Sequence, residues 1–490
     1  MQKSLFSTKR MLGNALNQGI FGILVTAGLL SGCTNLLPNN SAPTIALQGV
    51  TASTVAAKFV APLPAVDAAQ QAKFSDWWAQ FNDATLTQLV AHAIAHNTTV
   101  TQARASIVVA RSVLAESRAG MFPSVNVTAS ADTSRQRQAG ITTNSRNANA
   151  GIDAMWELDL FGFNQSLTAA ADARATQAIA QLGDARVSIS AEVVSTYVNL
   201  RTSQMLEAVY AQDRTATAQT ANLTSLKIKA GFEAQANAGL AEGDAAEAAN
   251  RYTGQREQTD LYVKALVALT NKNEATLRTD LQLSSAPVAL PAPARFAVTT
   301  LPAQLLEQRA DIAAATANVL AASADWRASR ADQYPRISLL GNISFNRLST
   351  GGNSANNSSL SFGPAINLPL FDAGKRQAAT EGAQSRIDIA QAQFEQTALR
   401  AVQEAEEGLV RLDSANTRAK IAQDAVRGYV SYLEGAQLRH KNGLANLLEL
   451  AQAQRTTVAA NAALLQVQRE RVQAWISLYK ALGGGWKEAQ

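Results

Sequence analysis

Two long stretches of the chain contain no proline, and this feature constrains the fold more than any other. No proline occurs between Pro123 and Pro287, and none occurs after Pro369. Because proline breaks a helix interior, only such stretches can hold very long helices. The spacing predicts one helix over 164–229 and another over 372–442, each on the order of 100 Å long at about 1.5 Å per residue. Helices of that length do not fit within a compact globular domain.

The chain also repeats itself with an offset of about 212 residues, the mark of a duplicated unit. Three pairs of corresponding residues carry this offset: Pro123 and Pro335, Glu192 and Glu404, Gly231 and Gly443. Each copy is predicted to contain a helix, two strands, a very long helix, a turn and a second long helix. Coiled-coil-like packing is predicted where apolar residues recur every seven positions, at Val458, Leu465, Val472 and Tyr479.

Two segments in each copy alternate apolar and polar residues over about ten positions, as strands with two different faces do. Such strands resemble transmembrane β-strands, whose backbone groups must all be paired inside the bilayer. The smallest closed barrels have about eight strands, so four strands would have to combine with those of other copies. A soluble, half-exposed sheet is the alternative. The connections at 133–148 and 347–358, rich in Ser, Asn, Gly and Arg, are predicted to be solvent-exposed loops.

The first 32 residues have the layout of a secretory signal peptide, with three basic residues, no acidic one and an apolar stretch over 20–30. That stretch is too short to cross a membrane as a helix. Directly after it, the tetrapeptide Leu30-Ser31-Gly32-Cys33 resembles the lipobox at which bacterial lipoproteins are lipidated. Cys33 is the only cysteine, so an intrachain disulfide is excluded. The alternative is an ordinary signal peptide followed by a chance cysteine.

Charge and chemistry exclude several functions. Without the leader, 43 minus 3 basic residues face 38 acidic ones, a net charge of only +2, so no nucleic acid is indicated as a partner. His92 and His96 share a helix face, but Ala93 stands where a zinc protease has glutamate, and His440 is the only other histidine. The sequence contains no phosphate-binding glycine loop and no nucleophile with a base. We therefore predict no enzyme activity, no cofactor and no metal site.

Five segments resemble one family. Residues 477–486 (SLYKALGGGW) are similar to the C-terminal signature of the TolC-like outer-membrane efflux factors, in the lipoprotein (NodT-type) branch that serves resistance-nodulation-division pumps. Four more segments resemble the same family, namely 76–81 (DWWAQF), 156–162 (WELDLFG), 305–312 (LLEQRADI) and 367–374 (NLPLFDAG). They occur in family order across nearly the whole mature chain.

The resemblance implies a mixed α and membrane-β fold. Four strands from each chain of a homotrimer would form a shared twelve-stranded barrel among the lipids of the outer membrane, continuous with a long α-helical barrel in the periplasm. Such a protein is the passive exit duct of a tripartite efflux pump. It would carry small toxic compounds from a periplasmic adaptor and an inner-membrane resistance-nodulation-division transporter to the exterior. A duct for type I protein secretion, or a structural periplasmic coiled-coil lipoprotein, is the alternative.

The expected organisation follows from these patterns. Its segments are a signal peptide (1–32), a lipidated tether (33–73), a helical hairpin (74–122), a first β-hairpin (123–163), a long helical pair (164–286), a belt segment with the helix of repeat two (287–334), a second β-hairpin (335–371), and a long helical pair with the C-terminal segment (372–490).

Two sets of candidate site residues lie near the turns between the long helices. Basic residues precede a glycine in both turns: Lys227 and Lys229 before Gly231, and Arg439 and Lys441 before Gly443. Such residues suit an ordinary helix C-terminus, where they offset the dipole and glycine takes the left-handed cap. The resemblance adds a second role, contact with the adaptor, and the two roles are compatible.

Residues 447–455 resemble the family segment that lines the closed periplasmic aperture. The resemblance places Leu448, Glu449, Gln452 and Arg455 there. The family commonly has an acid where this chain has Gln452, so an acidic ring is in doubt. Leu448 is then either an apolar constriction or an ordinary helix-seam residue. Glu449 supplies charge to the aperture only if the helix is rotated from the family's pose.

Overall fold

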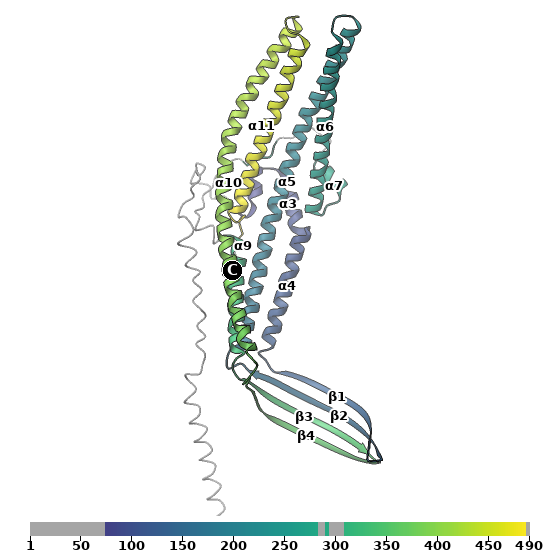
Figure 1. Cartoon of the computed structure of the whole chain (residues 1–490), viewed down its shortest axis with the longest axis vertical. Coiled ribbons are helices and arrows are strands. Elements are labelled where there is room, and N and C mark those ends of the chain that lie inside the picture. The colour runs from purple at the N-terminus through teal and green to yellow at the C-terminus, as the bar shows by residue number, and fades with distance from the viewer. Residues whose placement is uncertain (1–73, 283–289, 294–307, 487–490) are drawn as a thin grey trace, which may run out of the picture. The chain divides into compact units, whose positions relative to one another are not determined.

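The computed structural model describes residues 74–282, 290–293 and 308–486. Its helices and strands, labelled in Figure 1, are η2 (Phe74–Phe81), α3 (Ala84–His96), α4 (Thr98–Ala119), β1 (Ser124–Gln138), β2 (Ile141–Leu158), α5 (Phe163–Lys229), α6 (Gln235–Thr270), α7 (Glu274–Asp280), α9 (Ala310–Ala331), β3 (Arg336–Thr350), β4 (Asn353–Asn367), α10 (Lys375–Lys441) and α11 (Leu447–Ala481). The chain forms two compact units: residues 114–171 and 321–387 belong to the first, which holds the sheet, and the other described residues belong to the second.

The two proline-free stretches form the two longest helices in the described part of the chain. Helices α5 and α10 are each 67 residues long. They begin at Phe163 and Lys375, and 375 minus 163 gives the predicted offset of 212. In both copies a helix precedes two strands, and the long helix is followed by a second helix of 35 or 36 residues. The internal repeat predicted from the sequence is thus confirmed as a structural repeat.

Segment 74–122, expected as a helical hairpin, has no hairpin loop. A 3-10 helix is followed by α3 and α4, which are separated by the single residue Asn97. The Asn97 backbone N–H donates to the carbonyl of Ala93 at the end of α3, while its side-chain oxygen accepts from Thr99 N at 2.8 Å in the first turn of α4. One asparagine therefore caps both helices, and a loop of two to five residues, which a hairpin needs, is not present between them.

The four strands form one antiparallel sheet in the order β1-β2-β3-β4. Each hairpin closes with two residues of positive φ, Ala139 and Gly140 in the first, Gly351 and Gly352 in the second. Two such residues make the type I′ turn, which matches the twist of paired strands. The ladder therefore runs to the tips, and the expectation of solvent loops at 133–148 and 347–358 is wrong: most of these residues are paired in strands of 15 to 18 residues.

The register contains no bulge, so each strand has two well-defined faces. One face, here called the apolar face, carries Val125, Val127, Ile152, Ile343, Phe345, Leu360 and Phe362 among others, and these side chains are exposed in the single chain. The other face, here called the polar face, is joined by hydrogen bonds: Thr128 and Asn342 both donate to the Asp153 carboxylate, at 3.3 and 2.6 Å. The alternation predicted from the sequence is the alternation of these faces.

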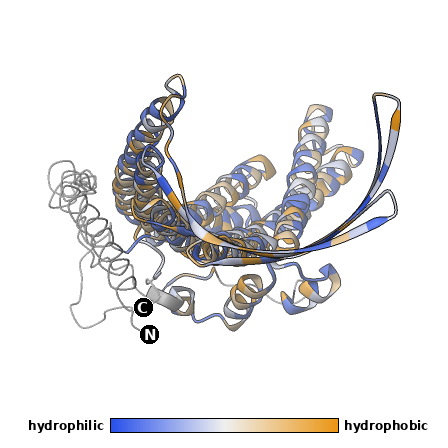
Figure 2. Ribbon diagram, turned by 90° about the horizontal axis from the view of Figure 1, so that it is seen from below, coloured by the Kyte–Doolittle hydropathy of each residue, from blue (hydrophilic) through white to orange (hydrophobic). Residues whose placement is uncertain are grey.

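The helical unit is packed mainly through small side chains. Buried alanines recur along α5 and α10, and Gly408 lets α10 approach Leu478 of α11 so closely that an added Cβ would lie 3.0 Å from its side chain. Leu465, Val472 and Tyr479 are buried, as their seven-residue spacing predicts. None of the helices within the described ranges combines the length and the hydropathy that a membrane-crossing helix needs. Figure 2 shows hydrophilic and hydrophobic residues mixed along them.

The segment before α3 packs on α11 through aromatic rings. Trp77, which is 1% exposed, stacks on Tyr479 with ring centroids 4.7 Å apart and contacts Trp475 at 5.3 Å. Phe81 meets Trp475 edge-on at 5.6 Å. Two motifs from opposite ends of the chain, DWWAQF and SLYKALGGGW, therefore contribute to one core.

Gly483 of the C-terminal motif lies against the backbone of Gln308 and Arg309, and the Arg309 side chain is buried. Arg309 binds Asp311 through two nitrogens (2.9 and 2.7 Å) and, through Nη1, the Glu404 carboxylate (2.9 Å) and the Ala481 carbonyl (2.8 Å). These partners raise the pKa of Arg309 despite its burial, so the guanidinium remains charged.

Candidate functional site: the helix tips and the aperture segment

The two turns between the long helices have the same hydrogen bonds. In the first, Gly231 N donates to the Ile228 carbonyl and Phe232 N to the Lys227 carbonyl, both at 2.9 Å. In the second turn Gly443 N and Leu444 N donate in the same way, at 3.0 and 2.8 Å. Both glycines have positive φ, +76° and +75°. This is the Schellman arrangement, in which only glycine takes the left-handed position without strain.

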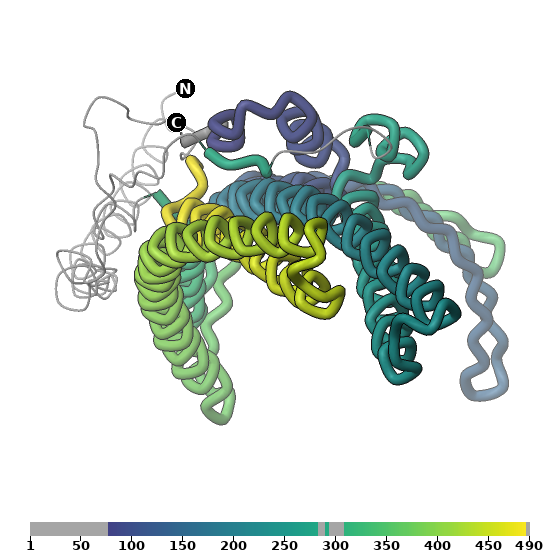
Figure 3. Tube along the Cα trace, turned by 90° about the horizontal axis from the view of Figure 1, so that it is seen from above, coloured from purple at the N-terminus to yellow at the C-terminus, as the bar shows by residue number. Residues whose placement is uncertain are grey.

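The basic residues predicted for the tips lie in the last turns of α5 and α10. Lys227, Lys229, Arg439 and Lys441 are all exposed. Their charges are close to the carbonyls at the helix C-termini, so capping accounts for their placement. Figure 3 shows that α5 lies beside α6 and α10 beside α11, with a tight turn joining each pair.

The structure adds two tip residues that the sequence analysis missed. Phe232 is 83% exposed and Leu444 is 76% exposed, and each directly follows the glycine of its turn. Both copies of the repeat thus expose a large apolar side chain at the end of a long helical pair, and no other part of the described chain covers it. The signal was present in the sequence, because both residues occupy the same position of the repeat.

Helix α11 begins with residues 447–455, here called the aperture segment after the role that the sequence predicts for them, and it is fixed to α10 there. The Asn446 side chain caps the helix by accepting from Glu449 N at 2.8 Å. The Glu449 carboxylate forms an ion pair with Arg439 of α10. The negative charge of Glu449 is therefore balanced inside the chain by one of the predicted tip residues.

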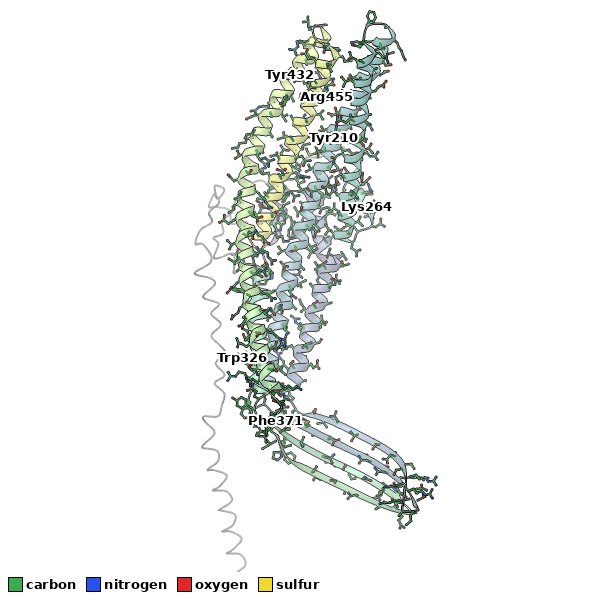
Figure 4. The ribbon with its side chains drawn as sticks, in the orientation of Figure 1. Tyr210, Lys264, Trp326, Phe371, Tyr432 and Arg455 are labelled. Atoms are coloured by element: carbon green, nitrogen blue, oxygen red, sulfur yellow. The ribbon has the colours of Figure 1, made fainter. Side chains whose placement is uncertain are left out.

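Arg455 links α11 to α6. Its Nη1 donates to both carboxylate oxygens of Asp244, at 2.7 and 2.8 Å, and its Nη2 donates to the Gln452 side chain at 3.0 Å. Arg455 thus lies between the two helical pairs (Figure 4). Both partners of the pair are partly shielded, with 32% and 20% of their side chains exposed, which makes the link stronger than a free surface pair.

A cavity of about 120 Å³ adjoins this link. Its lining comes from α5, α6 and α11 and includes Thr217, Thr224, Leu240, Leu448 and Arg455. Leu448 itself is 52% exposed, and Gln452 is exposed. The helical pairs are thus not close-packed beside the aperture segment, and α11 is held to α6 here mainly by the Arg455–Asp244 pair.

Of the residues proposed for the aperture, the structure brings together Glu449 with Arg439 and Gln452 with Arg455. It also adds Asp244, which lies in the third turn of α6 without any motif around it, so the sequence offered no signal for it. Cys33 and the signal peptide lie outside the described residues.

His92 and His96 do share a face of α3, with ring centroids 4.4 Å apart. His92 Nδ1 lies 3.0 Å from the Thr270 carbonyl at the end of α6. Burial and the adjacent His96 lower the pKa of His92, which favours the neutral ring as donor in this bond. Within the part of the chain that the structure describes, no three histidine, cysteine or carboxylate side chains converge on a metal position.

Comparison with known proteins agrees with this architecture. The family model described as "Outer membrane efflux protein" matches residues 89–272 and 301–484, one segment in each copy of the repeat. The antibiotic efflux pump outer membrane protein ArpC of Pseudomonas putida is 28% identical, with 96% of this chain and 97% of that protein covered. Outer membrane protein OprJ of Pseudomonas aeruginosa is 30% identical, covering 85% of this chain and 87% of that protein.

Among solved structures, the outer-membrane channel OprN superposes with a TM-score of 0.78 at 30% identity, over 89% of this chain and 98% of that one. The family expected from the sequence motifs is the one that matches.

Proposed function

Because the chain belongs to the outer membrane efflux protein family and is an outer-membrane exit duct, we propose that it serves a tripartite pump for small toxic compounds. Its partners would be a periplasmic adaptor and an inner-membrane transporter of the resistance-nodulation-division class. The proposal rests on the repeated apolar helix tips, because Phe232 and Leu444 are exposed in the single chain and a binding partner would cover them. Lipidation at Cys33 would add an anchor in the outer membrane.

The fold is completed by three copies of the chain. Strands β1 and β4 are the two edges of the sheet in one chain, and their outer backbone groups would be unpaired in lipid. Three sheets of four strands close a barrel of twelve strands and remove these edges. Members of this family are channels, and the barrel with its helical tunnel is the conduit.

We place adaptor contact at the two helix turns. Phe232 and Leu444 offer apolar surface, and the exposed Lys227, Lys229 and Lys441 add positive charge within five residues of them along the chain. Arg439 is exposed as well, with its charge paired to Glu449. An apolar centre with a charged rim is the usual composition of a protein interface. Gly231 and Gly443 position both apolar residues by allowing the left-handed turn.

A strain lacking this protein should become sensitive to a panel of toxic compounds, and the wild-type gene should restore resistance. We expect the double variant Phe232→Asp, Leu444→Asp to fail in that complementation while its trimer level in outer membranes stays normal, since both side chains are exposed and contribute little to the packing of the chain. The matched control is Ala230→Asp, Asn442→Asp, which adds the same charge one residue before each glycine. Full resistance with the Phe232 and Leu444 double variant would contradict docking at these tips.

We further propose that the periplasmic aperture is closed by apolar contact of Leu448 around the three-fold axis. Gln452 contributes neutral hydrogen bonds, and Glu449 is balanced by Arg439. The ion pair of Arg455 with Asp244 holds α11 against α6. An aperture of this composition depends little on pH or divalent cations, whereas a ring of three carboxylates repels itself and binds cations.

Leu448→Ala should raise the passive conductance in planar bilayers several-fold, far more than Gln452→Ala, because only the leucine supplies apolar contact. Gln452→Asp should create block by divalent cations that the wild type lacks. Single-channel recording with cations added on the periplasmic side measures both effects. If submillimolar divalent or trivalent cations already block the wild type, an acid such as Glu449 occupies the constriction and the apolar aperture is wrong.

A further inference from the structure

The outer ends of the strands carry four arginines on one face of the sheet. Arg135 and Arg137 lie on β1, Arg146 on β2 and Arg347 on β3. In the register Arg146 lies opposite Thr133, two residues from Arg135, and Arg347 lies opposite Ala148, two residues from Arg146. They are therefore successive diagonal neighbours across three strands, on one face and within reach of one another's long side chains.

This face is the apolar face. Along β1 the residues Val125 and Val127 alternate in step with Arg135 and Arg137, and along β3 the residues Ile343 and Phe345 lead directly to Arg347 at the next position of the same face. All four arginines are exposed. The basic cluster is thus the continuation of the surface that faces lipid in the closed barrel.

Acidic residues are absent from the apolar face of the four strands. The carboxylates of the strands, Asp132, Asp153 and Glu157, all lie on the polar face, where they meet Asn147, Asn342 and Arg336. No ion pair joins any of the four arginines to a carboxylate in the described ranges. Four neighbouring positive charges without a counter-charge repel one another, so this arrangement favours binding of an anion.

The position of the arginine cluster along the membrane normal identifies the environment of that anion. Arg135 lies ten residues beyond Val125, about 34 Å along the strand and roughly 26 Å along the membrane normal at a tilt of about 40°. That places the arginines where the apolar band ends, at the tips of the hairpins. At the opposite end of the sheet, Trp156 lies near the end of β2. Phe371, which is 90% exposed, follows β4 at the same end (Figure 4). Aromatic residues mark an interface, whereas arginine is suited to phosphate.

We propose that Arg135, Arg137, Arg146 and Arg347 form a binding site for the phosphate groups of lipid A, the phosphorylated glycolipid of the outer leaflet. Guanidinium groups bind phosphate through paired hydrogen bonds, and the acyl chains of the same lipid would cover the adjoining apolar face. A trimer has three such sites. The inference rests on the outer-membrane location and on the strand register, and not on the proposed transport substrate or pump partners.

The test uses the purified full-length trimer in detergent and native mass spectrometry. The probes are bisphosphorylated lipid A, the same lipid after removal of both phosphates, and phosphatidylglycerol. Wild-type trimer should bind the bisphosphorylated lipid at least tenfold more tightly than either other probe. Equal binding of the dephosphorylated form, or of phosphatidylglycerol, would overturn the proposal without the need for any variant.

The variant carrying R135Q, R137Q, R146Q and R347Q should lose this preference, with binding of bisphosphorylated lipid A weakened about tenfold to a hundredfold. The control removes the same charge from exposed helix positions, as R111Q, R186Q, R386Q and K420Q, and should bind like the wild type. Unchanged binding by the strand variant, or equal loss in the control, would overturn the assignment. Efflux in cells is a separate readout, so failure of the proposed transport function leaves this result interpretable.

Discussion

Ile343→Arg is expected to reduce trimer yield in outer membranes strongly, at a cost of about 2–4 kcal/mol for each chain. Ile343 lies on the apolar face of β3, opposite Ile152 and Leu360, and the side chain is 46% exposed in the single chain. It lies four positions before Arg347 of the arginine cluster, so it is well inside the apolar band. A charged side chain there has no partner in lipid, and three copies in the trimer multiply the loss.

Ser344→Arg is the matched control, because Ser344 is the next residue on the same strand and lies on the polar face opposite Gly151. Its arginine would face the water-filled side, so the trimer yield should fall much less. Heat-modifiable trimer in outer-membrane fractions is the measurement. Equal loss from the two substitutions would show that the assignment of lipid to the apolar face is wrong. The same comparison can be repeated on β2, where Trp156→Arg or Leu158→Arg should reduce trimer yield more than a polar substitution at Asp153 or Glu157.

Gly483→Ala is expected to destabilise the helical unit by about 3–5 kcal/mol, through two effects at one residue. Gly483 has a φ of +94°, which an L side chain rarely adopts, and an added Cβ would lie 2.2 Å from the Gln308 carbonyl oxygen. The obstacle is backbone next to Arg309, the arginine that holds the end of α11, so it cannot move aside without breaking that network.

Gly443→Ala separates the two effects. Gly443 also has a positive φ, +75°, but nothing lies within 4 Å of the added Cβ, so only the conformational cost of about 1–2 kcal/mol remains. Thermal unfolding of purified trimer, followed by circular dichroism, should show a much larger decrease in melting temperature for Gly483→Ala. Similar decreases for both variants would contradict the close approach at the C-terminal motif.

Local sequence patterns were sufficient to predict the long helices, the strands and the turns between the helices. The absence of proline allowed helices of 67 residues, and the alternation of apolar and polar residues marked the faces of the strands. The glycine turns were predictable because capping depends on a few neighbouring residues. Even Phe232 and Leu444 could have been found, since the repeat places both directly after a glycine.

The extent of the strands was not predictable in the same way. Segments 133–148 and 347–358 have the composition of loops, yet they continue the ladder because type I′ turns let each polar residue pair with one across the strand. Only this pairing fixes a face for Arg135, Arg146 and Arg347, so the basic cluster could not be recognised as a surface from the sequence.

The sequence by itself determined the long helices, the duplicated unit, the two-faced strands and the family, because each depends on spacing along one stretch of chain. The tertiary structure alone decided the contacts between distant residues. Asp244 and Arg455, 211 positions apart, meet because α6 and α11 lie side by side at the tip, and Arg309 reaches the Ala481 carbonyl across 172 positions. No local spacing encodes such pairs. The first depends on how the two copies of the repeat pack on each other, and the second on how α11 packs on the start of α9 within one copy.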